Sequence, residues 1–110
     1  MGKPNAHVIN DVKLFKKHIK QKYKVNRIIL FGSQARGESK KWSDVDLIVI
    51  SSKFKGKNAL KGAQNLYGEW HRHLNIDRPV DFLCYSPEEF KRQKNRISIV
   101  KQAIDEGIEI

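Results

Sequence analysis

The sequence predicts an α/β domain of the α+β kind, in which a small mixed β-sheet of three to four strands is flanked by helices. Three short runs rich in β-branched and aromatic residues indicate strands, and stretches with helical spacing of apolar residues surround them. A short link joins the first two runs, which favours antiparallel pairing. A helical stretch joins the second run to the third, which favours right-handed parallel pairing.

The first half of the chain predicts one long helix, two strands and a short helical turn. Residues 8–22 form an amphipathic helix with a basic outer face. Residues 25–31 are the first strand and residues 44–50 are the second. Between the strands, residues 33–36 can form a helical turn that Gly37 closes. The apolar positions of the long helix are Val8, Val12, Phe15 and Ile19.

The second half predicts two helical regions, a third strand and a short edge strand. Residues 60–74 follow helical spacing, residues 80–85 form the third strand, and Ser86 caps the start of the next helix. An apolar face then continues, with a break near Asn95, and residues 108–110 form the edge strand. The helix over residues 60–74 is expected to place these side chains in the core: Tyr67, Trp70 and Leu74.

One domain is expected to span residues 1–110, because a single core usually occupies about 100 to 200 residues and no repeat or linker divides the chain. The longest apolar run is far shorter than the roughly 18 residues of a membrane helix, and the N-terminus lacks the apolar stretch of a secretory signal. A cytoplasmic location without membrane contact is therefore expected. The single Cys84 agrees with a reducing compartment.

The composition is strongly basic, with 22 Lys and Arg against 12 Asp and Glu and a net charge of +10. Such a surface attracts polyanions such as nucleotides, nucleic acid or an acidic protein face. Lysine-rich faces are more often simply solvated, so the charge alone assigns no partner. His71 and His73 lie two residues apart on a predicted helix and point in different directions, so a metal shared between them is not expected.

Three aspartates are expected to converge at one edge of this sheet. Asp44 and Asp46 are two residues apart in the second strand, so their side chains project from one face, about 7 Å apart. Asp81 lies near the start of the third strand, which meets the same edge in the predicted topology. The C-terminal end of the first strand also reaches this edge.

Clustered carboxylates near an apolar core are costly through desolvation and mutual repulsion, and a bound cation relieves both. Oxygen ligands favour hard ions such as Mg²⁺ or Mn²⁺. In the alternative interpretation, Asp44 caps a turn and Asp46 pairs with a lysine. Asp81 then pairs with Arg78 or caps a local turn. A metal site is favoured because the alternative needs three unrelated local roles for three acids at the same edge of the sheet.

Gly32 and Ser33 directly follow the first strand and suggest an anion site. Glycine lets the backbone approach a phosphate closely, and serine offers a hydroxyl group. The stretch matches neither of the common glycine-rich phosphate motifs, and a Gly-Ser pair after a strand is on its own usually an ordinary turn. Beside a metal site made of carboxylates it favours phosphoryl or nucleotidyl transfer.

A resemblance to a known family rests on three motifs. They are Leu30-Phe31-Gly32-Ser33-Gln34-Ala35-Arg36-Gly37, Ser43-Asp44-Val45-Asp46-Leu47 and Val80-Asp81. Together they resemble the signature of the polymerase β-like nucleotidyltransferase superfamily, and the chain length resembles that of its minimal nucleotidyltransferase (MNT) family. The resemblance implies the nucleotidyltransferase fold and a metal-dependent nucleotidyltransferase activity.

The same resemblance implies roles for the acids. Asp44 and Asp46 would bind two metal ions, either Mg²⁺ or Mn²⁺. Asp81 would complete the second metal site and help to deprotonate the acceptor hydroxyl. All three acids are present, so a catalytically competent site is expected.

The resemblance also implies how a nucleoside triphosphate would be held. Gly32 and Ser33 would hold its phosphates, and Arg36 would contact the triphosphate. Alternatively, Arg36 pairs with Asp44 or Glu38. Many relatives carry a basic residue where this chain has Gln34, so a phosphate contact from that position is not implied.

Proteins of the MNT family typically act as antitoxins of helical HEPN toxins, and some transfer AMP from ATP to a tyrosine of the toxin. The resemblance therefore implies ATP as the substrate and a HEPN-type protein as the partner, with exposed apolar residues of the C-terminal region as the docking surface. One alternative is a non-catalytic antitoxin that neutralises its partner by covering it. The other is a basic nucleic-acid-binding module, which ranks last because no aromatic platform or recognition motif accompanies the charge.

Overall fold

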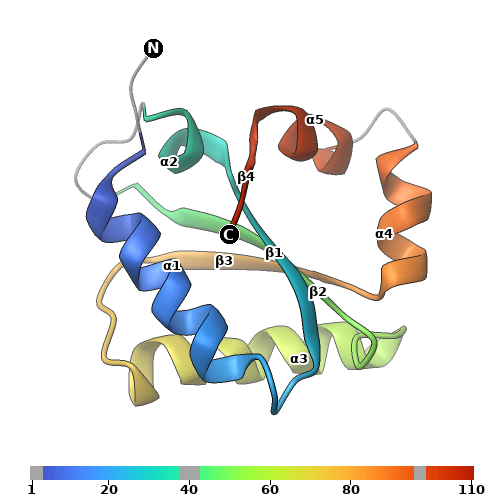
Figure 1. Cartoon of the computed structure of the whole chain (residues 1–110). Helices are drawn as coiled ribbons and strands as arrows, with labels where there is room; N and C mark the ends of the chain where they lie inside the picture. Colours follow the sequence, from blue (N-terminus) through green and yellow to red (C-terminus); the bar gives the residue numbers. More distant parts are fainter. Residues whose placement is uncertain (1–3, 38–42, 96–98) are drawn as a thin grey trace.

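A four-stranded mixed sheet with helices on both faces organises the chain (Figure 1). The computed structural model describes residues 4–37, 43–95 and 99–110. Along the chain the elements are α1 (Ala6–Ile19), β1 (Val25–Phe31), α2 (Gly32–Arg36), β2 (Val45–Ser51), α3 (Lys57–Gly68), the π-helix η1 (Glu69–His73), β3 (Val80–Tyr85), α4 (Pro87–Lys94), α5 (Ile99–Glu106) and β4 (Ile108–Glu109).

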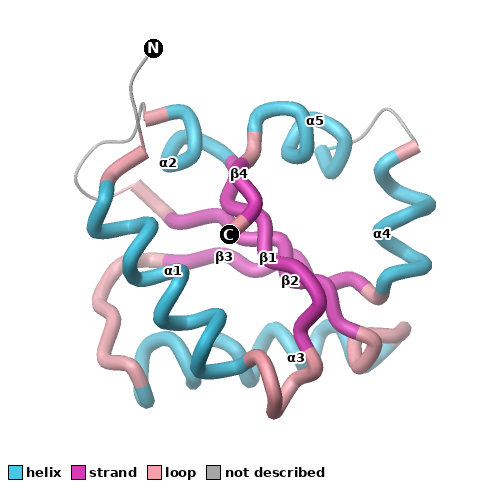
Figure 2. The backbone as a smooth tube through the Cα atoms, viewed as in Figure 1, coloured by secondary structure: helices cyan, strands magenta, loops and turns pink. Residues whose placement is uncertain are grey.

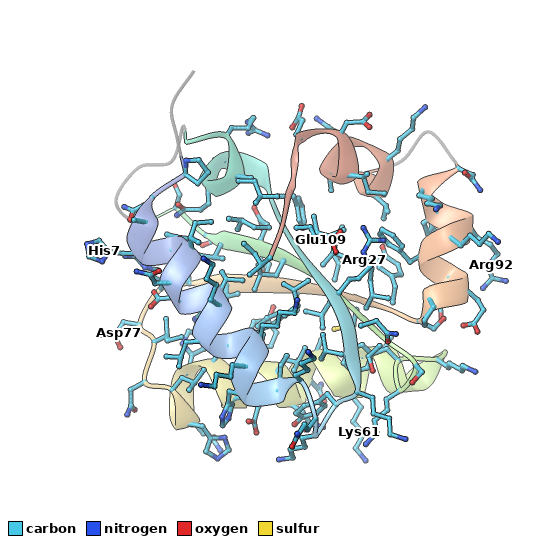
Figure 3. All side chains as sticks on the ribbon, viewed as in Figure 1. His7, Arg27, Lys61, Asp77, Arg92 and Glu109 are labelled. Carbon is cyan, nitrogen blue, oxygen red and sulfur yellow. The ribbon has the colours of Figure 1, made fainter. Side chains whose placement is uncertain are left out.

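The first three strands pair as the sequence predicts, and the structure adds the partner of the C-terminal edge strand. β1 and β2 are antiparallel, β2 and β3 are parallel, and β4 adds to β1 in antiparallel orientation, so the spatial order is β3-β2-β1-β4. The long connection through α3 and η1 carries the chain back across the sheet, as a parallel pair requires. An ion pair ties the edge strand β4 to β1, with Arg27 Nη2 lying 2.6 Å from Glu109 Oε1 (Figure 3). The predicted fold class is confirmed.

Each face of the sheet buries its own apolar cluster, because side chains alternate along a strand. On one face, Phe15 of α1 and Trp70 of η1 meet edge to face with ring centroids 5.2 Å apart, and Phe82 of β3 stacks on Phe15. On the opposite face, Phe90 of α4 and Val100 of α5 cover the strands. Figure 2 shows the strands enclosed between these two groups of helices.

Two helix boundaries differ from the prediction. α1 ends at Ile19, earlier than expected, because the chain turns into β1 there and Lys24 adopts a positive φ of 48°. The helix expected over residues 60–74 changes at Glu69 into a π-helix, in which the amide of Leu74 donates to the carbonyl of Glu69 at 3.1 Å. A π-helical turn widens the helix locally and often occurs at functional sites.

The described apolar residues of α5 and β4 do not form the exposed surface that was expected of the C-terminal region, and Ile97 of that region lies outside the described residues. Val100 and Ala103 are buried, and Ile104, Ile108 and Ile110 are half-buried. These residues instead complete the fold, because α5 covers the sheet and β4 pairs with β1. In the described part of the chain, no helix has both the length and the apolar character needed to cross a membrane.

Candidate active site at one edge of the sheet

Two aspartates lie side by side where three strands meet. The register pairs Asp46 of β2 with Phe31 of β1 on one side and with Asp81 of β3 on the other. Adjacent strands are about 4.8 Å apart, so the two carboxylates belong to one local site. By strand alternation, both project from the sheet face that α4 and α5 cover. The predicted convergence of Asp46 and Asp81 is therefore present.

Asp44 lies just before β2, and its side chain is exposed. Its negative charge raises the pKa of Asp46, which places the two carboxyl groups within electrostatic reach of each other. Asp44 therefore lies at the solvent-facing border of the site, whereas Asp46 is half-buried within it.

The backbone of Gly32 packs directly against this acidic edge. Gly32 has a φ of +75°, and a Cβ atom added there would lie 2.4 Å from Oδ2 of Asp46. A side chain at position 32 would therefore displace the carboxylate or the turn. Gly32 opens α2, and Gly37 ends it with a φ of 70°, so the short helical turn expected after the first strand is confirmed.

A cavity of about 610 Å³ joins the turn to the acids. Figure 1 shows α2 and α5 at the same end of the sheet, and α5 supplies one wall of this cavity. The predicted site residues that line it are Gly32, Ser33, Arg36, Asp46 and Asp81. The residues that α5 contributes are Gln102, Ala103 and Glu106.

Electrostatic crowding is strongest at Asp46. Burial is the largest cause that raises the pKa of Asp46, the negative charges of Asp81 and Asp44 add to the rise, and the positive charge of Arg36 opposes them, which together bring the pKa to about 6. An ionised set of these carboxylates is therefore costly without a cation. Because the donor atoms are carboxylate oxygens, the set fits a hard ion such as Mg²⁺ or Mn²⁺.

Arg36 has a partner that the sequence did not suggest. Its Nη1 lies 2.9 Å from Oε2 of Glu106 in α5, across the cavity wall. Of the two partners expected as alternatives, Glu38 lies outside the described residues. The ion pair holds α2 against α5 and keeps a guanidinium group at the cavity.

Two residues that sequence reasoning did not assign to the site support it. Tyr67 was expected in the core; it is half-buried, and its hydroxyl donates to Oδ1 of Asp81 at 3.3 Å. Gln34 is 2% exposed, and its Nε2 donates to the carbonyl of Ser43 at 3.0 Å, immediately before Asp44. Neither signal is visible in a local pattern, because each contact joins different elements.

The alternative partner suggested for Asp81 is engaged elsewhere. Arg78 Nε lies 3.1 Å from Oδ2 of Asp11 in α1, and Trp70 Nε1 donates to the carbonyl of Arg78 at 3.0 Å. These contacts fasten the loop before β3 to the opposite face of the sheet. The carboxyl of Asp81 remains at the edge, where Tyr67 reaches it.

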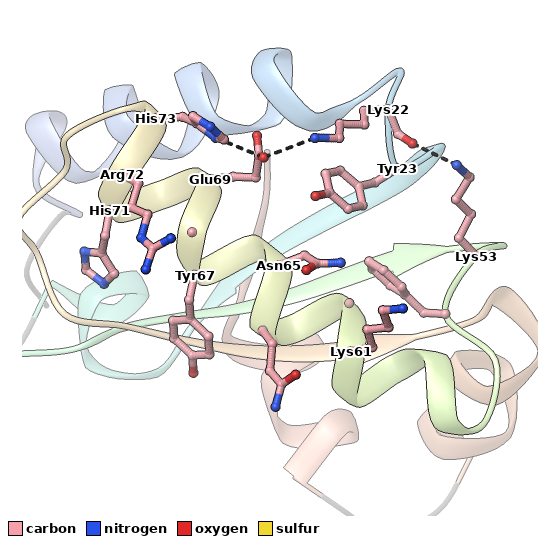
Figure 4. Close-up of a pocket in the computed structure, with 14 residues that line it drawn as sticks. Lys22, Tyr23, Lys53, Lys61, Asn65, Tyr67, Glu69, His71, Arg72 and His73 are labelled. Carbon is pink, nitrogen blue, oxygen red and sulfur yellow. Dashed lines mark hydrogen bonds and ion pairs between the residues drawn. The ribbon is translucent and has the colours of Figure 1, made fainter.

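A larger cavity of about 880 Å³ lies away from the carboxylate edge, between α3, η1 and two loops (Figure 4). Its lining is mainly basic and aromatic, and its buried acid is Glu69. Burial by itself raises the pKa of Glu69, but the hydrogen bond from His18 and the charge of Lys22 outweigh it, so the pKa is lowered. The smaller cavity is the better candidate active site, because it combines the paired carboxylates with the glycine turn.

A comparison with family models identifies the domain. The model described as a nucleotidyltransferase domain matches residues 12–108, from within α1 to the first residue of β4. Two relatives from Methanocaldococcus jannaschii are named "Putative protein adenylyltransferase" MJ1215 and MJ1379; over 34 residues they are 56% and 59% identical to this chain. Each match covers 31% of this chain, and 40% and 34% of the respective relative.

Solved structures share the fold at low sequence identity. A crystal structure described as a toxin–antitoxin with AMP-PNP aligns with a TM-score of 0.53 and 21% identity, covering 91% of this chain and 69% of that chain. A crystal structure described as "a putative nucleotidyltransferase from Sulfolobus solfataricus" aligns with a TM-score of 0.52 and 20% identity. The alignment covers 99% of this chain and 89% of that chain. At such identities the likeness establishes the fold alone.

Proposed function

Because the chain belongs to the nucleotidyltransferase domain family, we propose that it is a metal-dependent enzyme that transfers AMP from ATP to a hydroxyl group of a partner protein. Residues 1–110 would act as one catalytic domain in the cytoplasm. The observation that carries the proposal is the contact of the Gly32 backbone with the Asp46 carboxylate, beside Asp81. That contact joins a turn suited to phosphate with acids suited to metal.

The three acids would hold the metal. Asp46 and Asp81 are paired in register, and Asp44 adds a third carboxylate at the exposed side. When bound, Mg²⁺ or Mn²⁺ activates the attacking oxygen and neutralises charge on the phosphates. The raised pKa of Asp46 supports this assignment, because a cation would offset the repulsion that raises it.

The proposed reaction is a displacement at the α-phosphorus of ATP. The acceptor oxygen forms a bond to that phosphorus, the bond to the bridging oxygen of the β-phosphate breaks, and pyrophosphate leaves. Asp81 takes the proton of the acceptor hydroxyl. Arg36 pairs with the triphosphate charge, while the backbone at Gly32 and the hydroxyl of Ser33 hold its oxygens.

The proposed acceptor belongs to a HEPN-type toxin, for which this chain would be the antitoxin. Support comes from relatives named as protein adenylyltransferases and from a fold shared with a toxin–antitoxin structure. The cavity at the carboxylate edge is also where an acceptor hydroxyl group carried by another folded protein would enter. Nucleic acid would be involved only indirectly, through the toxin.

The test uses purified full chain, Mg²⁺ and a candidate HEPN-type protein, sought first in the neighbouring genes, with ATP labelled at either the α- or the γ-phosphate. We expect the partner to take up α-label and no γ-label. Asp44→Asn and Asp46→Asn should each abolish the transfer, whereas Asp77→Asn, an exposed acid in the loop before β3, should leave it unchanged.

The same variants separate catalysis from simple covering of the partner. If Asp44→Asn and Asp46→Asn still neutralise the toxin and no α-label ever moves, the chain is a non-catalytic antitoxin. Uptake of γ-label would instead indicate phosphoryl transfer. Either result would overturn the proposed nucleotidyl transfer.

A further inference from the structure

A buried carboxylate on the opposite side of the molecule from the aspartate edge is surrounded by nitrogen atoms. The side chain of Glu69 is 6% exposed. Its Oε2 lies 2.5 Å from Nε2 of His18, and its Oε1 lies 3.0 Å from Nδ1 of His73 and 3.4 Å from Nζ of Lys22. Figure 4 shows Glu69 with His73 and Lys22 at the wall of the larger cavity.

Two separate helices bring these groups together. His18 lies in the last turn of α1, whereas Glu69 and His73 lie four residues apart in η1. The π-helical turn places both η1 side chains toward α1, and the rings of His18 and His73 have centroids 5.9 Å apart. Directly below, Phe15 and Trp70 pack edge to face, so the two backbones that carry the three side chains are fixed by the core.

The donor atoms match a transition metal better than they match Mg²⁺. The ligand atoms of His18, Glu69 and His73 all lie within 4.8 Å of one another. Zn²⁺ binds nitrogen and carboxylate oxygen at about 2.0–2.2 Å in tetrahedral geometry, which sets ligand atoms roughly 3.3 Å apart. Small side-chain rotations would bring three donors to those positions. Two histidines with one glutamate form a known ligand set for zinc with a fourth position left open.

We propose that His18, Glu69 and His73 form a zinc-binding site that joins α1 to η1. Glu69 and His73 also line the larger cavity, so the fourth ligand would come from water or from a molecule bound there. The site is separate from the carboxylate edge and does not depend on the proposed function.

Lys22 is the group that a metal ion must replace at Glu69. Its ammonium is 3.4 Å from the carboxylate oxygen, and its side chain is 65% exposed. A flexible and exposed ammonium loses little when it returns to solvent. The histidine side chains are also accessible, at 35% for His18 and 60% for His73, so an ion can reach the site without unfolding.

The test is a zinc titration of the untagged full chain carrying Asp44→Asn and Asp46→Asn. These two substitutions disable the carboxylate site, so that it does not add to the number of zinc ions bound per chain. We expect one zinc per chain. A hundredfold excess of free zinc over its dissociation constant should raise Tm by about 10 °C or more, because the ion binds the folded state. Mg²⁺ at the same concentration should leave Tm unchanged.

Histidine variants in this background identify the ligands. His18→Ala and His73→Ala should each weaken zinc binding about 100-fold or more. Loss of a residue that only hydrogen-bonds a metal ligand already lowers metal affinity by about 10-fold to 100-fold, and loss of a ligand should cost no less. His7→Ala is the matched control, because His7 is an exposed histidine at the other end of α1. Co²⁺ provides a second measurement. Bound to the protein that retains both His18 and His73, it should show the visible absorption bands of a tetrahedral ion.

Failure of the parent chain to bind zinc, or binding that survives in both His18→Ala and His73→Ala, would overturn the proposal. A cobalt spectrum without tetrahedral bands would do the same. Because these variants alter exposed side chains, their far-ultraviolet circular dichroism should match that of the parent, and a loss of binding would then reflect lost ligands.

Discussion

A Cβ atom on Gly32 would lie 2.4 Å from Oδ2 of Asp46, so the turn after β1 and the acid of β2 occupy adjoining space with no room for a side chain. This contact makes one site of two segments that are separate in the sequence. The proposed phosphate-binding backbone and the proposed metal-binding carboxylate then have a fixed relation. A substitution at either Gly32 or Asp46 should therefore affect both phosphate binding and metal binding.

Gly32→Ala should destabilise the chain more than the same change at Gly56. Both glycines have positive φ, but an added Cβ at Gly56 meets nothing within 4 Å. We expect Gly56→Ala to cost about 1–2 kcal/mol for the backbone conformation alone. Gly32→Ala should cost about 1–3 kcal/mol more, because overpacking is added. Urea unfolding of both variants measures the difference, and equal losses would contradict the close contact.

Metal-free protein should lose stability as pH rises through the titration of Asp46. Its pKa is raised from 3.8 to about 6 in the folded chain, so the folded state binds the proton more tightly than the unfolded state does. This stabilising contribution is present below pH 3.8 and is lost as pH rises past about 6. Asp46→Asn should therefore have a higher Tm than the original chain at pH 8 in EDTA, with little difference at pH 4. A constant difference across that range would contradict the crowded-acid geometry.

Arg36→Ala should impair nucleotide binding while leaving the fold intact. Hydrogen bonds to charged groups contribute about 1.5–3 kcal/mol, so loss of a triphosphate contact should raise KM for ATP about tenfold to hundredfold. Arg27→Ala is the matched control, because Arg27 forms a comparable exposed pair with Glu109 at β4. Both variants should change stability by no more than about 1 kcal/mol. An unchanged KM in Arg36→Ala would remove this residue from the site.

Gln34→Ala should weaken both folding and activity. The buried amide holds the carbonyl of Ser43, and leaving a buried polar group unpaired costs about 1–3 kcal/mol. Because Asp44 follows directly, the rate of AMP transfer should fall as well. Gln64→Ala, at an exposed position of α3, should stay within about 0.5 kcal/mol of the original chain. Equal stability of the two variants would contradict the positioning role of Gln34.

The sequence was sufficient for the sheet and for the local parts of the site. Apolar periodicity and link lengths predicted the pairing of β1 with β2 and of β2 with β3. The predicted strand included Asp44, but β2 begins at Val45, so the strand alternation that was expected to align Asp44 with Asp46 does not extend to Asp44. The positive φ of Gly37 follows from its place after a short turn. These features depend on neighbours along the chain.

Contacts between elements that are distant in the sequence could not be predicted from the pattern of residues. The ion pair of Arg36 with Glu106 requires α5 to return beside α2, and the hydrogen bond from Tyr67 to Asp81 requires α3 to pass the start of β3. Likewise, His18 meets Glu69 only because α1 packs against η1. Apolar periodicity assigned Tyr67 to the core and gave His18 no role. Periodicity shows which face of a helix is buried, but it does not show which residue of another element that face contacts.

Calorimetric titration of ATP into the purified full chain, with Mg²⁺ and with EDTA, measures directly whether metal and nucleotide share one site. We predict binding that requires the metal and weakens at least about tenfold in Asp46→Asn and Asp81→Asn, as loss of a metal ligand should. Asp77→Asn, an exposed control, should bind as the original chain does. Equal affinity with Mg²⁺ and with EDTA, or unchanged affinity in both variants, would contradict a metal–nucleotide site at the Asp46–Asp81 edge.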